Sequence, residues 1–121
     1  MLSGTIYRKV CSMLACLVAT IGGNSGKRIL LVAHLDTVFS SDNAFQRFVL
    51  SADEKHASGP GVIDDKGGLV TILFALKALH HVGKLKNANI TVVLVGDEEL
   101  AAKPTDISRS YALTGLQRYE K

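Results

Sequence analysis

Two apolar runs on either side of an amphipathic segment constrain the fold of this chain most strongly. Residues 28–34 (RILLVAH) have the pattern of a strand buried on both faces of a parallel sheet, and residues 89–96 (NITVVLVG) form a second strand pattern. Between them, residues 67–80 predict a nearly buried helix, because apolar side chains recur at helical spacing: Leu69, Ile72, Leu73, Leu76 and Leu79, widened by Val70 and Phe74. A right-handed crossover makes the two strands parallel, so we predict an α/β fold with a parallel-containing sheet and crossover helices.

The segments outside this unit carry weaker signals. Gly22–Lys27 (GGNSGK) predicts a loop and fails as a phosphate loop, because no glycine lies five residues before Gly26. Residues 36–60 are mixed and loop-like. Their apolar side chains, Phe45, Phe48, Val49 and Leu50, are expected to pack a short element onto the body of the protein.

The first residues of the chain allow two interpretations. Arg8 and Lys9 precede an apolar stretch, Val10–Ile21, which is too short for a transmembrane helix but within the range of a signal-peptide core. No cleavage site is convincing, so we favour a buried strand or helix at the edge of the domain and a cytoplasmic over an exported location. Cys11 and Cys16 lie outside any CxxC pair and are interpreted as buried free thiols.

Composition limits the size and the class of the protein. The 121 residues, 47% hydrophobic and 21% charged, are typical of one small globular domain. The net charge of +3 comes from scattered lysines and arginines, and there is no tryptophan to stack on bases, so we expect no nucleic acid partner. We also expect no membrane span, and composition does not set the oligomeric state.

The first chemical motif lies at the end of the first strand. In His34-Leu35-Asp36, the alternation of an extended chain points His34 and Asp36 to the same side. A carboxylate there can orient the imidazole, as carboxylates do for histidines that bind metals. By itself, the motif is more typical of an ordinary loop histidine than of a metal ligand.

The second motif, Gly59 to Gly68 (GPGVIDDKGG), places two carboxylates at the start of the predicted helix. Asp65 could serve only as the helix cap, with Asp64 stabilised by the positive end of the helix dipole. Four glycines and a proline around the two acids instead indicate a backbone held in a tight path, which a simple cap does not need.

The third motif follows the second strand, where Asp97, Glu98 and Glu99 stand in a row. A solvated acidic turn is one interpretation. However, adjacent like charges are costly unless cations neutralise them, and the predicted order of elements brings all three acidic motifs to one rim of the sheet. A dication is the natural occupant of such a rim.

Together these segments (LLVAHLDTVF, GPGVIDDKGG and VVLVGDEE) resemble the N-terminal motifs of the co-catalytic zinc peptidases, over residues 28 to 108. That family includes glutamate carboxypeptidase, acetylornithine deacetylase, succinyl-diaminopimelate desuccinylase and aminoacylase. The resemblance implies two zinc ions, with cobalt or manganese as substitutes, and a peptide or N-acyl amino acid substrate. It implies His34, Asp64 and Glu99 as metal ligands, Glu98 as general base, Asp36 as the residue that orients His34, and a cis peptide bond between Asp64 and Asp65.

The sequence also departs from that family. A further acidic ligand and a last histidine, expected well after the acid pair, have no match, since the tail offers only Asp106 and Glu120. The resemblance therefore implies a partial catalytic domain of a zinc peptidase over residues 28–121, preceded by an N-terminal segment and loop over 1–27. Three hypotheses stay open: a fragment of a zinc amide hydrolase, a degenerate non-catalytic metal-binding or interaction domain, and a carboxylate-only magnesium enzyme.

Overall fold

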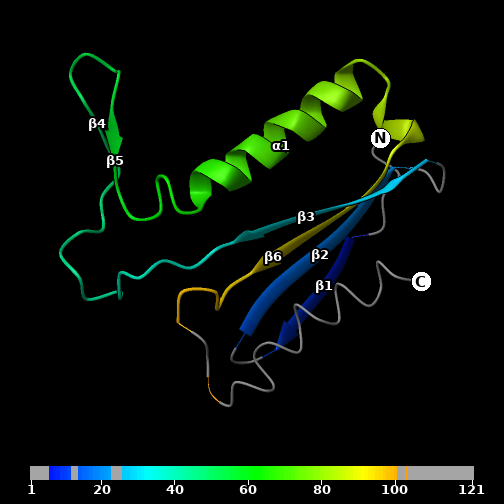
Figure 1. The fold of residues 1–121 in the computed structure, drawn as a ribbon. Helices are drawn as coiled ribbons and strands as arrows, with labels where there is room; N and C mark the ends of the chain where they lie inside the picture. Colours follow the sequence, from blue (N-terminus) through cyan, green and yellow to red (C-terminus); the bar gives the residue numbers. More distant parts are fainter. Residues whose placement is uncertain (1–5, 12–13, 23–25, 101–102, 104–121) are drawn as a thin grey trace.

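The computed structural model describes residues 6–11, 14–22, 26–100 and 103, and its main element is a mixed four-stranded sheet in the order β1-β2-β6-β3 (Figure 1). β3 and β6 are parallel, as predicted, whereas β2 runs antiparallel to both β6 and β1. The strands are β1 (Ile6–Cys11), β2 (Leu14–Gly22), β3 (Arg28–His34) and β6 (Asn89–Val95). With helix α1 (Lys66–His81) between β3 and β6 in the chain, the described part is an α/β unit.

The apolar stretch near the N-terminus forms strands. Val10 and Cys11 end β1, and residues 14–22 form β2, which pairs with β6 from Cys16–Val95 to Gly22–Asn89. The expectation of a strand is thus confirmed and the helical alternative is wrong, while the burial of Cys11 and Cys16 lies outside the described side chains. The division of the chain at residue 27 and the cytoplasmic location stay predictions. Each helix in the described ranges falls short of what a membrane crossing requires.

The core lies between α1 and one face of the sheet. Ile90 and Val92 of β6 are buried with Leu85, which belongs to the short 3-10 helix η1 (Leu85–Asn87), and Ile72 and Leu76 of α1 pack against them. The predicted helix is confirmed with nearly the same bounds, but its predicted burial is wrong. Val70, Leu73 and Phe74 are 49%, 50% and 60% exposed, because a single sheet face contacts only part of so wide an apolar stripe.

The two parallel strands differ in burial. β6 lies between β2 and β3, and its residues from Ile90 to Val93 are all buried. β3 lies at the edge of the sheet, where Ile29 and Val32 are 45% and 55% exposed, so the prediction that it is buried on both faces is wrong. Position in the sheet, which the local pattern does not contain, explains the difference.

The loop region between β3 and α1 contains a small hairpin, β4 (Val49–Leu50) paired with β5 (Ala57–Ser58), which projects away from the sheet (Figure 1). Phe48 is 69% exposed, and Val49 and Leu50 are exposed as well. The expected packing of this segment onto the body is therefore wrong. Local bonds hold the hairpin instead, including Ser51 N–H to the His56 carbonyl at 2.8 Å.

Candidate metal centre

The ends of β3 and β6 bring the three sequence motifs together. The parallel register sets His34 opposite Val95, and the Leu35 N–H donates to the Val95 carbonyl at 2.7 Å. Residues that follow the two strands therefore leave the sheet side by side, at the edge where ligands collect in α/β folds. We call the residues gathered there, 34–36, 64–65 and 98–99, the strand-end rim.

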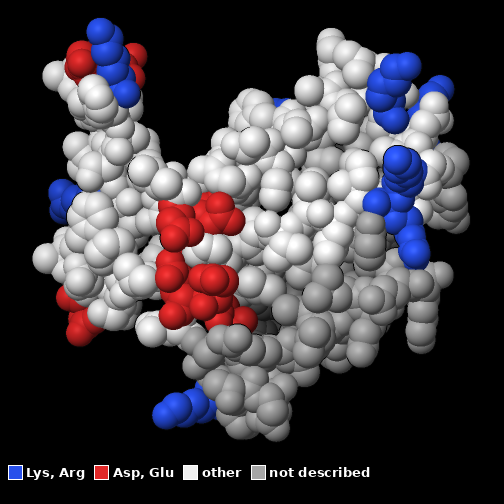
Figure 2. Space-filling view, viewed as in Figure 1, with Lys and Arg blue, Asp and Glu red and all other residues white. Residues whose placement is uncertain are grey.

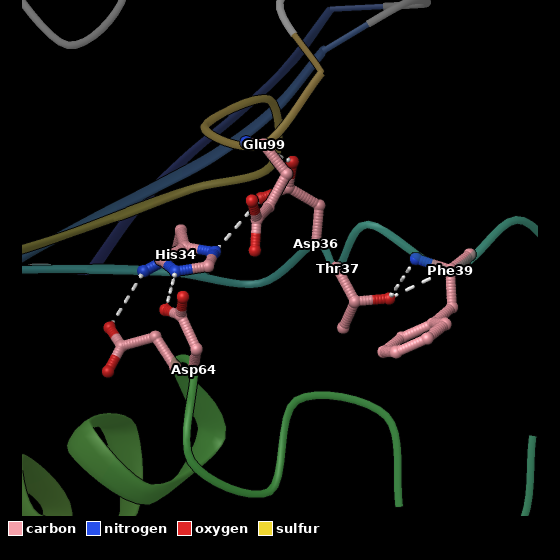
Figure 3. A network of polar contacts seen from close by, with 7 residues as sticks. His34, Asp36, Thr37, Phe39, Asp64 and Glu99 are labelled. Carbon is pink, nitrogen blue, oxygen red and sulfur yellow. Dashed lines mark hydrogen bonds and ion pairs between the residues drawn. The ribbon is translucent and has the colours of Figure 1, made fainter. Parts of the chain in front are cut away.

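His34 is the buried centre of the rim, with 7% of its surface exposed (Figure 3). Its Nδ1 lies 3.3 Å from Asp36 Oδ1, and its Nε2 lies 2.9 Å from Asp64 Oδ1. Burial alone would lower the pKa of His34, but the hydrogen bonds to Asp64 and Asp36 outweigh it and raise the pKa above the ordinary histidine value. The two carboxylates therefore favour the protonated form of the imidazole.

Asp36 joins the first motif to the third. While its Oδ1 meets the His34 ring, its Oδ2 accepts the backbone N–H of Glu99 at 3.0 Å. Burial alone would raise the pKa of Asp36, but the backbone N–H groups of Glu99, Asp36 and Glu98 lower it below the usual aspartate value. Asp36 is thus an anion that fixes the ring of His34 and the backbone of Glu99 at once.

The paired acids before α1 take separate positions. The peptide bond between Asp64 and Asp65 is cis, as expected. Asp64 reaches the His34 ring, whereas Asp65 Oδ2 accepts the His34 backbone N–H at 3.3 Å. Asp65 occupies the N-cap position of α1 but makes no side-chain capping bond, so the interpretation of this residue as a simple helix cap is wrong.

Sequence reasoning missed Asp65 and Gly68 as parts of this site. A Cβ on Gly68 would overlap Asp65 Oδ1 and lie 3.0 Å from Asp65 Cγ, so the glycine leaves room for the carboxylate that holds His34. Gly61, with a φ of 72°, shapes the same turn in a conformation that favours glycine. The cluster of glycines around two acids was the available signal, and the tight backbone that it predicted is present.

Glu98 and Glu99 complete the rim. One ligand atom each from His34, Glu98 and Glu99 lies within 4.8 Å of the other two. Glu98 is exposed and Glu99 is partly buried. Asp64 is not a member of this trio but contacts its His34, and with Glu99 it lines one cavity. All five predicted site residues therefore lie in one neighbourhood, and Figure 2 shows acidic side chains gathered in one patch beside the projecting hairpin.

The side chains of the rim fit a dication that accepts both nitrogen and oxygen ligands. Zinc is bound by imidazole nitrogen and carboxylate oxygen about 2.0 to 2.2 Å away, which holds its ligands roughly 3 to 4 Å from one another. The trio of His34, Glu98 and Glu99 is slightly wider than this, while Asp64 Oδ1 lies 2.9 Å from His34 Nε2. Magnesium prefers oxygen ligands, so the central imidazole favours zinc or a similar metal over the carboxylate-only alternative. Asp106 and Glu120 of the tail lie outside the described residues.

Two curated relatives are similar to this chain over about 70% of its length. The chain is 39% identical over 83 residues to carboxypeptidase G2 of a Pseudomonas species, a match that covers 69% of this chain and 20% of the relative. It is 34% identical over 89 residues to a probable di- and tripeptidase, DUG2, of Saccharomyces cerevisiae, covering 70% of this chain and 10% of the relative. The chain thus corresponds to a fifth or less of the length of these proteins.

The match to a family model extends over most of the chain. The model of peptidase family M20/M25/M40 matches residues 30–118, which include most of β3, all of α1 and β6, and every residue of the strand-end rim. This family of metal-dependent peptidases agrees with the resemblance that the three motifs indicated. The chain belongs to peptidase family M20/M25/M40.

Proposed function

We propose that this chain supplies the first part of the active site of a metal-dependent hydrolase of peptide or amide bonds, of the carboxypeptidase or N-acyl-amino-acid deacylase type. The observation that carries the proposal is the close approach of His34, Glu98 and Glu99 within 4.8 Å, in a chain of the M20/M25/M40 family. Both relatives are named as peptidases, which supports a peptide substrate.

His34, Asp64 and Glu99 are the proposed metal ligands. The His34 Nε2 atom faces Asp64, so this ring nitrogen is the one available to a metal that the two residues share. Asp36 holds the opposite nitrogen, which favours the tautomer that leaves Nε2 free to coordinate. Two zinc ions need more ligands than these three residues provide, and we assign the others to sequence outside the described residues.

Glu98 is the proposed general base. When bound, zinc supplies a water of lowered pKa and polarises the scissile carbonyl. The Glu98 carboxylate accepts the proton of the attacking water and then donates it to the leaving amine nitrogen, so that the C–N bond breaks after the new C–O bond has formed. Its exposure suits this role, because a base must reach both the water and the substrate.

The direct test is the amount of zinc that remains on the purified full chain after dialysis, measured by elemental analysis. We expect about one zinc ion per chain or more, lost in His34→Ala. The matched control is His56→Ala, because His56 lies on the projecting hairpin and is exposed. Absence of zinc from the unsubstituted chain, or equal loss in both variants, would contradict the proposal.

Hydrolysis distinguishes an active site from a degenerate one. A panel of dipeptides and N-acyl amino acids, incubated with the zinc-loaded chain, should be cleaved by the unsubstituted protein and not by Glu98→Gln. Zinc binding without any cleavage that depends on Glu98 would favour the non-catalytic metal-binding domain over the hydrolase.

A further inference from the structure

A cavity that the proposed chemistry does not use lies toward the opposite end of α1 from the strand-end rim (Figure 1). Its volume is about 610 Å³, which is within the range of small-molecule sites. Side chains from β2, α1 and η1 surround it, and most of this wall is apolar: Ile21, Leu73, Phe74, Leu76 and Leu85. A wall of this kind favours an apolar group over water.

The inner and outer walls of the cavity differ in exposure. Leu85 is 4% exposed, and Ile21 and Leu76 pack against the core cluster to which it belongs. Leu73 and Phe74, by contrast, are 50% and 60% exposed. The core therefore fixes the inner wall, while the outer wall keeps at least half of its surface open to a ligand. Exposed apolar side chains beside polar ones are typical of ligand grooves.

The cavity is long in the direction of the helix. Its lining on α1 extends from Leu73 to His81, and this separation corresponds to about 12 Å of helix. Apolar side chains line the part near Leu73, whereas the polar lining residues, Lys77, His80 and His81, lie toward the end of the helix. An extended molecule with an apolar tail and a polar head matches this order.

The polar end of the cavity carries a cation and hydrogen-bond donors. Lys77 offers an ammonium group with three donors, and each imidazole of His80 and His81 offers at least one ring N–H. The Lys77 Nζ lies 5.1 Å from the centre of the Phe74 ring, so the positive charge stands directly beside the apolar wall. Among the described residues that line the cavity, none is aspartate or glutamate. This end is therefore complementary to an anion.

The carbonyl groups at the end of α1 already have partners. The C-terminus of a helix carries partial negative charge, which repels an anion when its carbonyl oxygens are bare. Here the carbonyl oxygens of Ala78, Leu79 and His80 each accept a backbone N–H from the residues that follow the helix, at 2.9 to 3.1 Å. An anion at this end thus meets the donors of the side chains with less opposition from the backbone.

From this arrangement we infer that the cavity between α1 and η1 binds an amphipathic carboxylate, a free acid with an aliphatic tail. The tail lies along Leu73 and Phe74, and the carboxylate accepts hydrogen bonds from Lys77 and from an imidazole beside it. The inference is independent of the proposed hydrolase function, because no residue of the strand-end rim lines this cavity.

The test is a ligand-observed NMR titration of the full chain with three probes, each kept below the concentration at which it forms micelles: decanoate, hexanoate and decyltrimethylammonium. We expect decanoate to bind about tenfold or more tightly than hexanoate, because its longer tail buries more apolar surface. It should bind about fivefold more tightly than decyltrimethylammonium, whose head group has the opposite charge. Equal affinity for decanoate and decyltrimethylammonium would overturn the inference, since it would indicate adsorption to any apolar surface.

Substitutions then locate the binding. Lys77→Gln should weaken decanoate binding about twofold to fivefold, and its matched control is Lys55→Gln, because Lys55 is exposed on the projecting hairpin. Phe74→Ser should weaken binding about threefold or more by removing apolar contact. Its matched control is Phe48→Ser, because Phe48 is 69% exposed and does not line this cavity. Equal losses in the variants and their controls would contradict a site in this cavity.

Removal of zinc with a chelator distinguishes this cavity from the strand-end rim, where a bound metal can itself hold a carboxylate. The affinity for decanoate should be the same before and after zinc is removed. Loss of decanoate binding together with the zinc would assign the probe to the rim and overturn the inference. A chain that never holds zinc and still binds decanoate would contradict the proposed metal centre and support this site.

Discussion

The strand-end rim and the outer face of α1 stand in contrast. On the rim, His34 is buried and both of its ring nitrogens have a carboxylate partner, while Asp36 bonds to groups from two motifs. On the outer face of α1, Leu73 and Phe74 are at least half exposed. The clustered charges of the rim, which are costly to bury, thus have hydrogen-bond partners. The apolar side chains on the outer face of α1, by contrast, stay exposed to solvent.

This difference shows that the rim depends on few elements. The side chains of the rim follow the ends of two parallel strands or directly precede α1, and all of them lie within residues 28–99. Burial of a wide apolar stripe requires a second surface to pack against, and Ile72 and Leu76 are the α1 residues that pack against the buried cluster on the sheet. The following experiments test whether the two regions are as independent as this comparison indicates.

The largest effect is expected at Glu98. Glu98→Gln should lower the rate of amide hydrolysis by about 10² to 10⁴, because the general base is lost, while zinc stays bound. Glu99→Gln is the companion variant and should weaken zinc binding, since Glu99 is the partly buried member of the pair. Rates and zinc affinity are measured on the same preparations. Equal loss of zinc from both variants would mean that Glu98 is itself a ligand and that the roles are wrongly divided.

A smaller effect is expected at Asp36. Its carboxylate accepts from both the Glu99 N–H and the His34 ring, and an asparagine side chain has only one accepting atom. If the substituted side chain keeps the bond to Glu99, its amide donates to His34 Nδ1 and moves the ring proton to Nε2, the atom proposed to bind metal. Asp36→Asn should therefore weaken zinc binding by about 10- to 100-fold.

The control for this experiment is Asp53→Asn, which makes the same change of charge on the projecting hairpin, where Asp53 is exposed. Zinc titration by competition with a chelator compares the two variants. A similar loss of affinity in both would indicate that net charge, and not the orientation of His34, controls metal binding.

The comparison also explains what the sequence predicts well. The parallel pairing of β3 with β6 and the bounds of α1 follow from local patterns, and the meeting of His34, Asp36 and Glu99 follows from where those strands end. The spacing of apolar residues and the residues that end each strand can both be read from short stretches of sequence. These predictions therefore agree with the structure.

What the sequence predicts poorly depends on distant partners. The run at 28–34 looks fully buried, yet Val32 is 55% exposed because β3 lies at an edge, and sheet order is not a local property. Phe48 looks like a packing residue but lies beside a hairpin that projects from the sheet. The carboxylate of Asp65 bonds to His34 across 31 positions of the chain, a contact that its position before a helix does not indicate.

A third experiment concerns the stability of the rim. In a helix, Gly→Ala ordinarily stabilises by up to about 1 kcal/mol. At Gly68 the added Cβ would overlap the Asp65 carboxylate, which would have to turn away and give up its bond to the His34 N–H, so we expect Gly68→Ala to destabilise the chain by about 1 kcal/mol. Urea unfolding measures the change. The double variant with Asp65→Ala removes the overlap and should recover part of the loss, whereas an additive loss would mean that Gly68 acts through another contact.

The smallest effect is expected on the outer face of α1. Phe74 is 60% exposed, and its ring lies 5.1 Å from Lys77 Nζ, measured to the ring centre, on the same helix. Phe74→Ser should therefore change the free energy of unfolding by about 0.5 kcal/mol or less, whereas Leu76→Ala, which removes a side chain packed on the core, should cost more than about 1 kcal/mol. Urea unfolding of both variants in the same buffer gives the comparison. If Phe74→Ser cost as much as Leu76→Ala, the outer face would be a packed surface in solution, and the contrast between a satisfied rim and an uncovered helix face would not hold.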